Sequence, residues 1–164
     1  MNSLECVRSK IIDWVELERV GYRARFFNKK IVFTNGCFDI LHRGHIEYLY
    51  QAADMGDLLI VGLNSDASVR RIKGPDRPVQ DEETRALLLA SLSCVTHVVL
   101  FDEDTPLKLI QLVQPDILVK GGDYADLEKI VGYDIVKQRG GEVVALPFVE
   151  GHSTTQLLQK IQQL

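Results

Sequence analysis

Five short apolar runs, separated by longer stretches with helical patterning, constrain the fold of this chain more than any other feature. The runs are strand-sized and occupy residues 31–34, 58–63, 97–101, 117–119 and 143–146. Their apolar character is nearly continuous rather than alternating, which is typical of strands covered by helices on both faces. The segments between them are long enough for crossover helices. The sequence therefore predicts an α/β fold with a Rossmann-like, doubly wound, five-stranded parallel sheet.

Helix signals stand between the apolar runs. A residue suited to an N-cap begins each of four segments, and Pro106 follows one of these residues at the favoured first helical position. A further helix begins near Asp126 and ends at Gly140. The four predicted caps are Asp66, Asp81, Thr105 and Ser153.

The N-terminal segment differs from the rest of the chain. Residues 3–20 place apolar side chains at helical spacing with charged residues between them, which predicts one amphipathic helix. The polar stretch that follows predicts a hinge. We therefore expect an N-terminal helix and hinge over residues 1–28, and a single domain over residues 29–164.

Composition excludes several classes of protein. The 164 residues suit one domain, and 19 Lys and Arg against 23 Asp and Glu give a net charge of −4, so no global field attracts nucleic acid or an anionic bilayer. Three widely spaced cysteines offer neither a disulfide framework nor a CxxC metal spacing. The N-terminus lacks a signal-peptide pattern, and the apolar runs are too short to span a membrane. We expect a cytoplasmic protein.

The residues after the first predicted strand carry the strongest chemical signal. His42 and His45 flank Gly44 at the start of the next predicted helix, where unpaired amides and the helix dipole favour a phosphate. Three-residue spacing puts both imidazoles on one face of the first turn. A single such His-x-Gly-His pattern is more often structural than functional, and a zinc site would need further ligands that the sequence does not supply at recognisable spacing.

Two motifs resemble those of the cytidylyltransferase-like nucleotidyltransferases. The motif nearer the C-terminus is Ser-Thr-Thr at 153–155, at the start of the last predicted helix, where His152 replaces an apolar residue. Two motifs in the right order over a compatible fold identify residues 29–164 as a nucleotidyltransferase domain. The first motif, Gly-x-Phe-Asp-x-x-His-x-Gly-His, matches at Gly36, Phe38, Asp39, His42, Gly44 and His45.

A finer resemblance is to adenylyltransferases that act on D-glycero-β-D-manno-heptose 1-phosphate. Segments 64–71, 73–74, 77–79, 103–106 and 118–124 carry it. The resemblance implies transfer of AMP from ATP to that sugar phosphate, with release of ADP-heptose and pyrophosphate, for a lipopolysaccharide core or a similar glycan. Phe148 stands where the related glycerol-3-phosphate cytidylyltransferases carry an arginine. That cytidylyltransferase activity and a non-catalytic nucleotide-binding module are the two alternatives.

The family pattern also implies a set of site residues. We expect catalytic roles for His42, His45 and Lys73, with a solvated surface position as the alternative for Lys73. Asp39 is interpreted as a cap or histidine-orienting residue in preference to a Mg²⁺ ligand, and the Mg²⁺ as held mainly by substrate phosphates, without a protein metal site. The expected nucleotide- and substrate-binding residues are Thr34, Asn35, Gly36, Phe38, Gly44, Arg77, Arg85, Lys120, Gly121, Asp123, Ser153 and Thr154.

The resemblance finally implies partners. They are ATP and a sugar 1-phosphate, with neither nucleic acid nor membrane involved. Because only about thirty residues precede the first predicted strand, we expect a separate heptose kinase upstream in the pathway. A homodimer is expected as well, since relatives commonly pair and the helix around Trp14 offers apolar surface.

Overall fold

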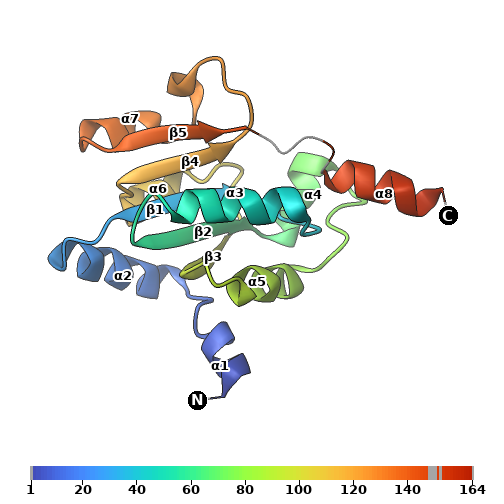
Figure 1. Cartoon of the computed structure of the whole chain (residues 1–164), viewed down its shortest axis with the longest axis horizontal. Helices are drawn as coiled ribbons and strands as arrows, with labels where there is room; N and C mark the ends of the chain where they lie inside the picture. The colour runs from blue at the N-terminus through green and yellow to red at the C-terminus, as the bar shows by residue number, and fades with distance from the viewer. Residues whose placement is uncertain (1, 148–150, 152, 164) are drawn as a thin grey trace.

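The computed structural model describes residues 2–147, 151 and 153–163, and its centre is a five-stranded sheet (Figure 1). All strand pairs are parallel, in the order β3-β2-β1-β4-β5. The predicted doubly wound parallel sheet is confirmed. Strand order reverses between β1 and β4, so a ligand is expected at the carboxyl ends of these two strands. The strands are β1 (Ile31–Gly36), β2 (Leu58–Asn64), β3 (His97–Phe101), β4 (Ile117–Gly121) and β5 (Glu142–Leu146).

Helices cover both faces of the sheet, and alternate strand residues feed two apolar cores. Phe33 and Leu118 face the core with helices α2 and α6, whereas Val32 and Val119 face the core with α3 and α5. This division explains why the strands read as continuous apolar runs. The helices are α1 (Ser3–Arg8), α2 (Trp14–Phe26), α3 (Arg43–Ala53), α4 (Asp66–Lys73), α5 (Glu82–Ser91), α6 (Leu107–Val113), α7 (Tyr133–Gln138) and α8 (Thr154–Gln162), with a 3₁₀ turn, η1 (Leu127–Lys129). No helix in the described ranges is both long and apolar enough to cross a membrane.

The prediction of one helix over residues 3–20 is wrong, because α1 and α2 are separated by an extended segment. Ile11 forms a parallel bridge with Val98 of β3, and the Ile12 amide donates to the Val98 carbonyl at 3.0 Å. The segment therefore covers the open edge of β3, which would otherwise present unpaired backbone groups. Leu17 of α2 is fully buried in the same core as β1. The N-terminal segment is thus folded onto the sheet, while the boundary at residue 28 stays a prediction.

Two predicted helix starts are confirmed and two are wrong by one residue. Asp81 and Ser153 cap α5 and α8, accepting from the amides of Thr84 and Gln156. The cap of α4 is Ser65 rather than Asp66, and α6 is preceded by Pro106 rather than by Thr105.

The helix predicted from Asp126 to Gly140 is broken into η1 and α7. Gly132, with φ 92°, lies between them, and a Cβ added there would come within 2.7 Å of Ile110. Close approach to α6 and a left-handed backbone therefore turn the chain at this point.

Candidate active site

The first motif occupies a sharp turn between β1 and α3. Phe38 adopts φ 43°, which is uncommon for a residue with a side chain, and is almost fully buried. A Cβ on Gly36 would stand 3.0 Å from the Phe38 ring. Gly36 therefore makes room for Phe38, and the turn delivers His42 to the N-terminus of α3. Gly44 lies half-buried in the first turn of that helix.

His42 and His45 lie against each other at this helix end. Their rings stack with centroids 3.8 Å apart and planes 21° apart, and Phe38 contacts His45 with centroids at 5.2 Å. Burial and the neighbouring His42 lower the pKa of His45 to about 4, so its imidazole is neutral at pH 7. Within the described part of the chain, the buried Nδ1 of His45 has no hydrogen-bond partner.

The N-terminus of α3 is open to an anion. His42 is its N-cap residue but makes no side-chain capping hydrogen bond. Uncapped amides carry the positive end of the helix dipole, which favours negative charge. The Nδ1 atom of His45, in the first turn beside these amides, is a suitable contact for phosphate oxygens.

Asp39, the acidic residue of the motif, binds a second loop. Its carboxylate accepts from Arg77 Nε at 2.5 Å and from the amides of Val79 and Gln80 at 2.8 and 3.0 Å. Burial raises the pKa of Asp39, but the Gln80 and Val79 amides and Arg77 outweigh burial and hold that pKa below its usual value. The structural interpretation of Asp39 is supported, but it caps neither α3 nor a histidine. Both of its carboxylate oxygens are engaged by the loop after α4.

Arg85 is fully buried beneath the same loop. Its guanidinium donates to the carbonyls of Gln80, Cys37 and Asn64 at 3.1, 2.7 and 2.9 Å, and to the Asp66 carboxylate at 2.7 Å. The expectation that Arg85 contacts a substrate phosphate is corrected by this geometry, because its donors point into the protein. Arg85 instead ties the motif loop to β2, α4 and the loop after α4.

Three cations surround the start of the motif. Lys73, the exposed last residue of α4, lies close enough to Cys37 to act on its thiol, as do Arg85 and Arg77. Burial raises the pKa of the Cys37 thiol, and these three charges reduce that rise. The sequence-predicted Lys73 and Arg77 are thus brought beside the motif loop.

The carboxyl ends of β1 and β4 place a lysine at the switch point. Lys120 donates from Nζ to Asn35 Oδ1, and burial lowers the pKa of Lys120 to about 8. Thr34 is also buried, but its hydroxyl bonds the Tyr48 hydroxyl at 2.6 Å, and Tyr48 donates to the Val119 carbonyl at 3.2 Å. Thr34 therefore does not present its hydroxyl to a ligand.

Tyr48 was missed by sequence reasoning. Burial raises its pKa to about 12, so it remains a protonated donor. Its position three residues after His45 in α3 was the available signal. The tyrosine fastens α3 to the carboxyl ends of β1 and β4.

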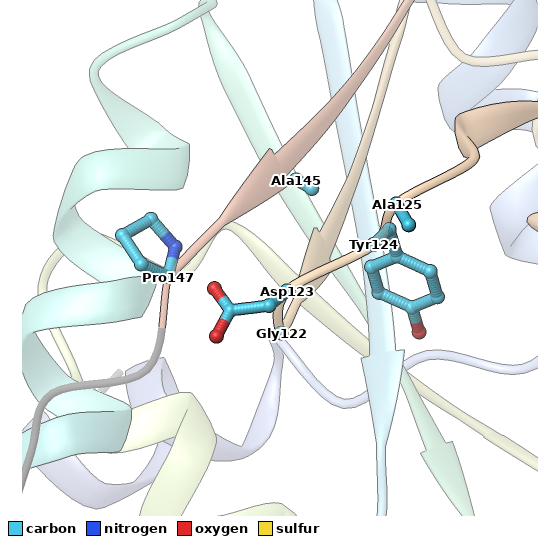
Figure 2. Close-up of a pocket in the computed structure, with 6 residues that line it drawn as sticks. All are labelled: Gly122, Asp123, Tyr124, Ala125, Ala145 and Pro147. Atoms are coloured by element: carbon cyan, nitrogen blue, oxygen red, sulfur yellow. The ribbon is translucent and has the colours of Figure 1, made fainter.

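An open pocket of about 400 Å³, the cavity discussed below, lies beyond β4. Figure 2 shows the residues that line it. The Asp123 carboxylate points toward Pro147, and the Tyr124 ring lies on the other side of the chain (Figure 2). Gly121, at the end of β4, leads into this segment. Only Asp123 among the lining residues was predicted for the site. The cavity is lined by Gly122, Asp123, Tyr124, Ala125, Ala145 and Pro147.

The second motif lies at the start of α8, on the side of the molecule toward which the strands lead (Figure 1). Ser153 and Thr154 are half-buried there. The hydrogen bonds of the described residues include none between them and the histidines of α3. Phe148 and His152 lie outside the described residues. Among the described residues, no group of three or more His, Cys, Asp or Glu side chains forms a metal cage.

Fold and site together define an α/β protein with a stacked histidine pair at the start of the helix that follows β1, beside the switch point of a parallel sheet. The sequence profile of the cytidylyltransferase-like family matches residues 33–160, and the chain belongs to this family.

Curated relatives agree with the profile. The "Bifunctional protein HldE" of Citrifermentans bemidjiense is 59% identical over 153 residues, which cover 93% of this chain and 31% of the relative. The protein of the same name from Syntrophotalea carbinolica is 53% identical over 155 residues, covering 94% and 30%. The chain thus spans less than a third of the length of these relatives.

Solved structures are similar as well. A lipopolysaccharide core biosynthesis protein from Thermoplasma volcanium aligns with a TM-score of 0.60 and 31% identity, over 76% of this chain and 99% of that one. The pantoate-β-alanine ligase of Francisella tularensis aligns with a TM-score of 0.59 and 16% identity, over 94% and 78%. The second likeness shows the nucleotidyltransferase fold alone.

Proposed function

We propose that the protein transfers AMP from ATP to D-glycero-β-D-manno-heptose 1-phosphate, giving ADP-heptose and pyrophosphate. The observation that carries the proposal is the stacked His42–His45 pair at the uncapped N-terminus of α3. Sequence identity above 50% with HldE proteins, over more than 90% of this chain, supports heptose 1-phosphate as the substrate. Fold alone would not specify this chemistry.

In the proposed reaction a phosphate oxygen of the sugar attacks the α-phosphorus of ATP, and the bond to pyrophosphate breaks. A phosphate monoester dianion is already nucleophilic, so no residue must act as a general base. Catalysis then consists of aligning two polyanions and stabilising charge on the α-phosphoryl and leaving oxygens. His42 and His45 are assigned to the triphosphate, as hydrogen-bond donors in the transition state.

The other site residues have supporting roles in the proposal. Lys73 and Arg77 attract the substrate phosphate or the leaving pyrophosphate from the loop after α4. Lys120 and Asn35 contact the nucleotide at the switch point, and α8 presents the Ser153 hydroxyl and the Thr154 amide to the triphosphate. Gly36, Phe38 and Gly44 shape the motif turn, while Gly121 and Asp123 border the cavity beyond β4.

Magnesium enters the proposal through the nucleotide. The engaged Asp39 carboxylate and the lack of a carboxylate cage among the described residues fit a metal held by phosphates and water. When bound, Mg²⁺ would neutralise charge on the triphosphate. The residues of this chain would still orient the phosphates and exclude water.

The proposed substrates also imply a setting. We propose that a separate kinase phosphorylates the heptose upstream in the pathway. We propose a cytoplasmic location, where ATP is available, and a product used for heptose-containing glycans.

The test is pyrophosphate release by purified protein with Mg²⁺, crossing ATP and CTP against heptose 1-phosphate and glycerol 3-phosphate. The proposal expects release with the pair ATP and heptose 1-phosphate, and with no other pair. Release only with CTP and glycerol 3-phosphate would replace it by the cytidylyltransferase alternative. Nucleotide binding without release from any pair would favour a non-catalytic module.

A further inference from the structure

The hydroxyl of Tyr48 links three elements that meet at the switch point. Tyr48 belongs to α3, its hydroxyl lies 2.6 Å from the Thr34 hydroxyl of β1, and it donates to the Val119 carbonyl of β4 at 3.2 Å. A phenol carries a single proton, so the Thr34 hydroxyl is the donor in the first of these bonds. Thr34 and Val119 are fully buried. One side chain therefore joins the helix to both strands at residues that solvent does not reach.

This link stands where β1 and β4 separate. Their backbone register covers two residue pairs, of which the last is Phe33 with Leu118, whereas both strands run on for three more residues. At the next level Thr34 and Val119 are joined through the Tyr48 hydroxyl. A ligand at a switch point enters between strands that separate in this way. The tyrosine hydroxyl thus stands at the base of the opening that a ligand would enter.

Two polar site residues lie one level further along the strands. Asn35 follows Thr34 in β1, Lys120 follows Val119 in β4, and the Lys120 ammonium donates to Asn35 Oδ1. The link through Tyr48 therefore sets the spacing of the two strands directly beneath the Lys120–Asn35 contact.

The same side chain fixes the start of α3. Tyr48 follows His45 by three residues, so the two side chains lie on one face of the helix, about 4.5 Å apart along its axis. His45 in turn stacks on His42, with ring centroids 3.8 Å apart. Bonds from Tyr48 to both strands thus set how far the histidine pair stands from Lys120.

Loss of this hydroxyl would leave two buried polar groups without the partner they have now, the Thr34 hydroxyl and the Val119 carbonyl. Buried groups of this kind are costly, so they admit water or shift toward another partner. Either change moves the strands relative to α3. A misplacement of about 1 Å in a site that works by alignment lowers the rate by as much as about 100-fold.

Tyr48 is unsuited to proton transfer in this arrangement. Burial raises its pKa to about 12, and its proton is already donated to the Val119 carbonyl. The proposed reaction requires no general base either. The geometry of the hydroxyl, rather than its acidity, is therefore what the site uses.

We propose that Tyr48 is a positioning residue of the transferase site, whose hydroxyl holds the histidine pair of α3 at a fixed spacing from Lys120 and Asn35. The inference rests on the function proposed above. A bond that only stabilised the fold would change how much of the protein is folded and leave the folded molecules fully active. A positioning bond instead lowers the turnover of molecules that are folded.

Steady-state kinetics of Tyr48→Phe test the inference, because phenylalanine keeps the ring and loses only the hydroxyl. We expect kcat to fall about tenfold, with the KM of each substrate changed by less than about twofold. Tyr50→Phe is the matched control: Tyr50 lies on the same helix and its hydroxyl is also 2.6 Å from a partner, Ser93, but this pair is exposed. A kcat of Tyr48→Phe equal to that of Tyr50→Phe overturns the inference.

Substitutions of Thr34 break the same link from the strand and keep the inference testable should Tyr48→Phe fail to fold. Thr34→Val removes the hydroxyl and should lower kcat severalfold, whereas Thr34→Ser keeps a hydroxyl and should lose less. The double variant Tyr48→Phe, Thr34→Val should be no slower than Tyr48→Phe alone, because both changes remove one link. Effects that multiply would show that the two hydroxyls act separately, against the inference.

The imidazole resonances of the free protein give a readout that does not depend on turnover. In proton–nitrogen correlation spectra, Tyr48→Phe should displace those of His42 and His45 and leave that of His97, at the start of β3, in place. Tyr50→Phe should displace none of the three. An unmodified chain that releases no pyrophosphate would overturn the proposed function, and the spectra would still decide whether Tyr48 positions the histidines. Resonances of His42 and His45 that stay in place would refute that role.

Discussion

The two halves of the sheet's carboxyl edge are built differently. On the β1–β2 side, Asp39 and Arg85 lock the motif loop and the loop after α4 through buried, charged hydrogen bonds. On the β4–β5 side, an open cavity of about 400 Å³ is bordered by backbone, small side chains, the Asp123 carboxylate and the half-exposed Tyr124. The first half is held by buried, charged hydrogen bonds, and the second carries an open pocket.

This difference separates two tasks. Phosphate groups need donors in fixed positions, because charge stabilisation depends on donors that require no reorganisation during reaction. The remainder of a ligand needs space and a few polar contacts. We therefore assign the chemistry and the binding of phosphate groups to the locked half, and the fit of the rest of the ligand to the open half. Substitutions of the histidines should lower kcat, whereas substitutions in the open half should raise KM alone.

The largest effect is expected at the stacked histidines. His42→Ala and His45→Ala should each lower kcat by about 100-fold or more, because each removes a donor used in the transition state. His97→Gln is the matched control: this half-buried histidine starts β3, outside the motif, and its buried Nδ1, like that of His45, lacks a hydrogen-bond partner within the described chain. Pyrophosphate release measures the effect. Near-normal turnover in either folded alanine variant would remove that histidine from the mechanism.

The next effect concerns the buried hydrogen bonds of Arg85, which hold the motif loop in place. Arg85→Met leaves the Asp66 carboxylate and three carbonyls without their buried partner, so the free energy of unfolding should fall by about 3 kcal/mol. Arg71→Met is the control, since the ion pairs of Arg71 with Asp102 and Asp104 are exposed. Urea unfolding of both variants checks the difference. Equal stabilities would contradict a locked half.

Asp39→Asn tests the contacts between the motif loop and the loop after α4, with enzyme activity as the measurement. The amide retains the shape of the side chain but loses the charge that binds Arg77. We expect Lys73 and Arg77 to lose their placement, raising the KM of the sugar phosphate about tenfold. An unchanged KM would mean that the loop after α4 is a solvated surface loop that does not bind the sugar phosphate.

The sequence predicted the sheet and the histidine pair, but not the buried hydrogen bonds of Asp39 and Arg85 that hold the motif loop. Continuous apolar runs report burial on both faces, and three-residue spacing on a helix brings side chains together regardless of the rest of the chain. Arg85 was misinterpreted because arginines are rarely fully buried, and its partners lie up to 48 residues away in the sequence. The break between α1 and α2 was missed for a similar reason, since Ile11 pairs with Val98. Long-range pairing overrides local periodicity at such points.

Lys120 lies between the two halves and should give a pH dependence. Burial lowers its pKa to about 8, so in the free protein the ammonium loses its proton as pH rises through that value. Anionic nucleotide favours the charged form, so nucleotide affinity should fall above about pH 8. Lys120→Met should bind about tenfold more weakly at pH 7 and lose this dependence. Nucleotide titrations from pH 6.5 to 9.5 distinguish the outcomes, and an equal slope in both proteins would exclude Lys120 as its source.

The smallest effect is expected in the open half. Tyr124 borders the cavity without a hydrogen bond to another described residue, so Tyr124→Ala removes ligand contact area and leaves the locked half intact. We expect KM to rise about threefold to tenfold, the range of one aromatic contact, with kcat unchanged. Tyr50→Ala is matched in exposure, since both tyrosines are 44% exposed, but Tyr50 lies on α3 and bonds Ser93 instead of bordering the cavity. A fall in kcat with unchanged KM for Tyr124→Ala would mean that the open half takes part in the chemical step, and the division of tasks along the sheet edge would be lost.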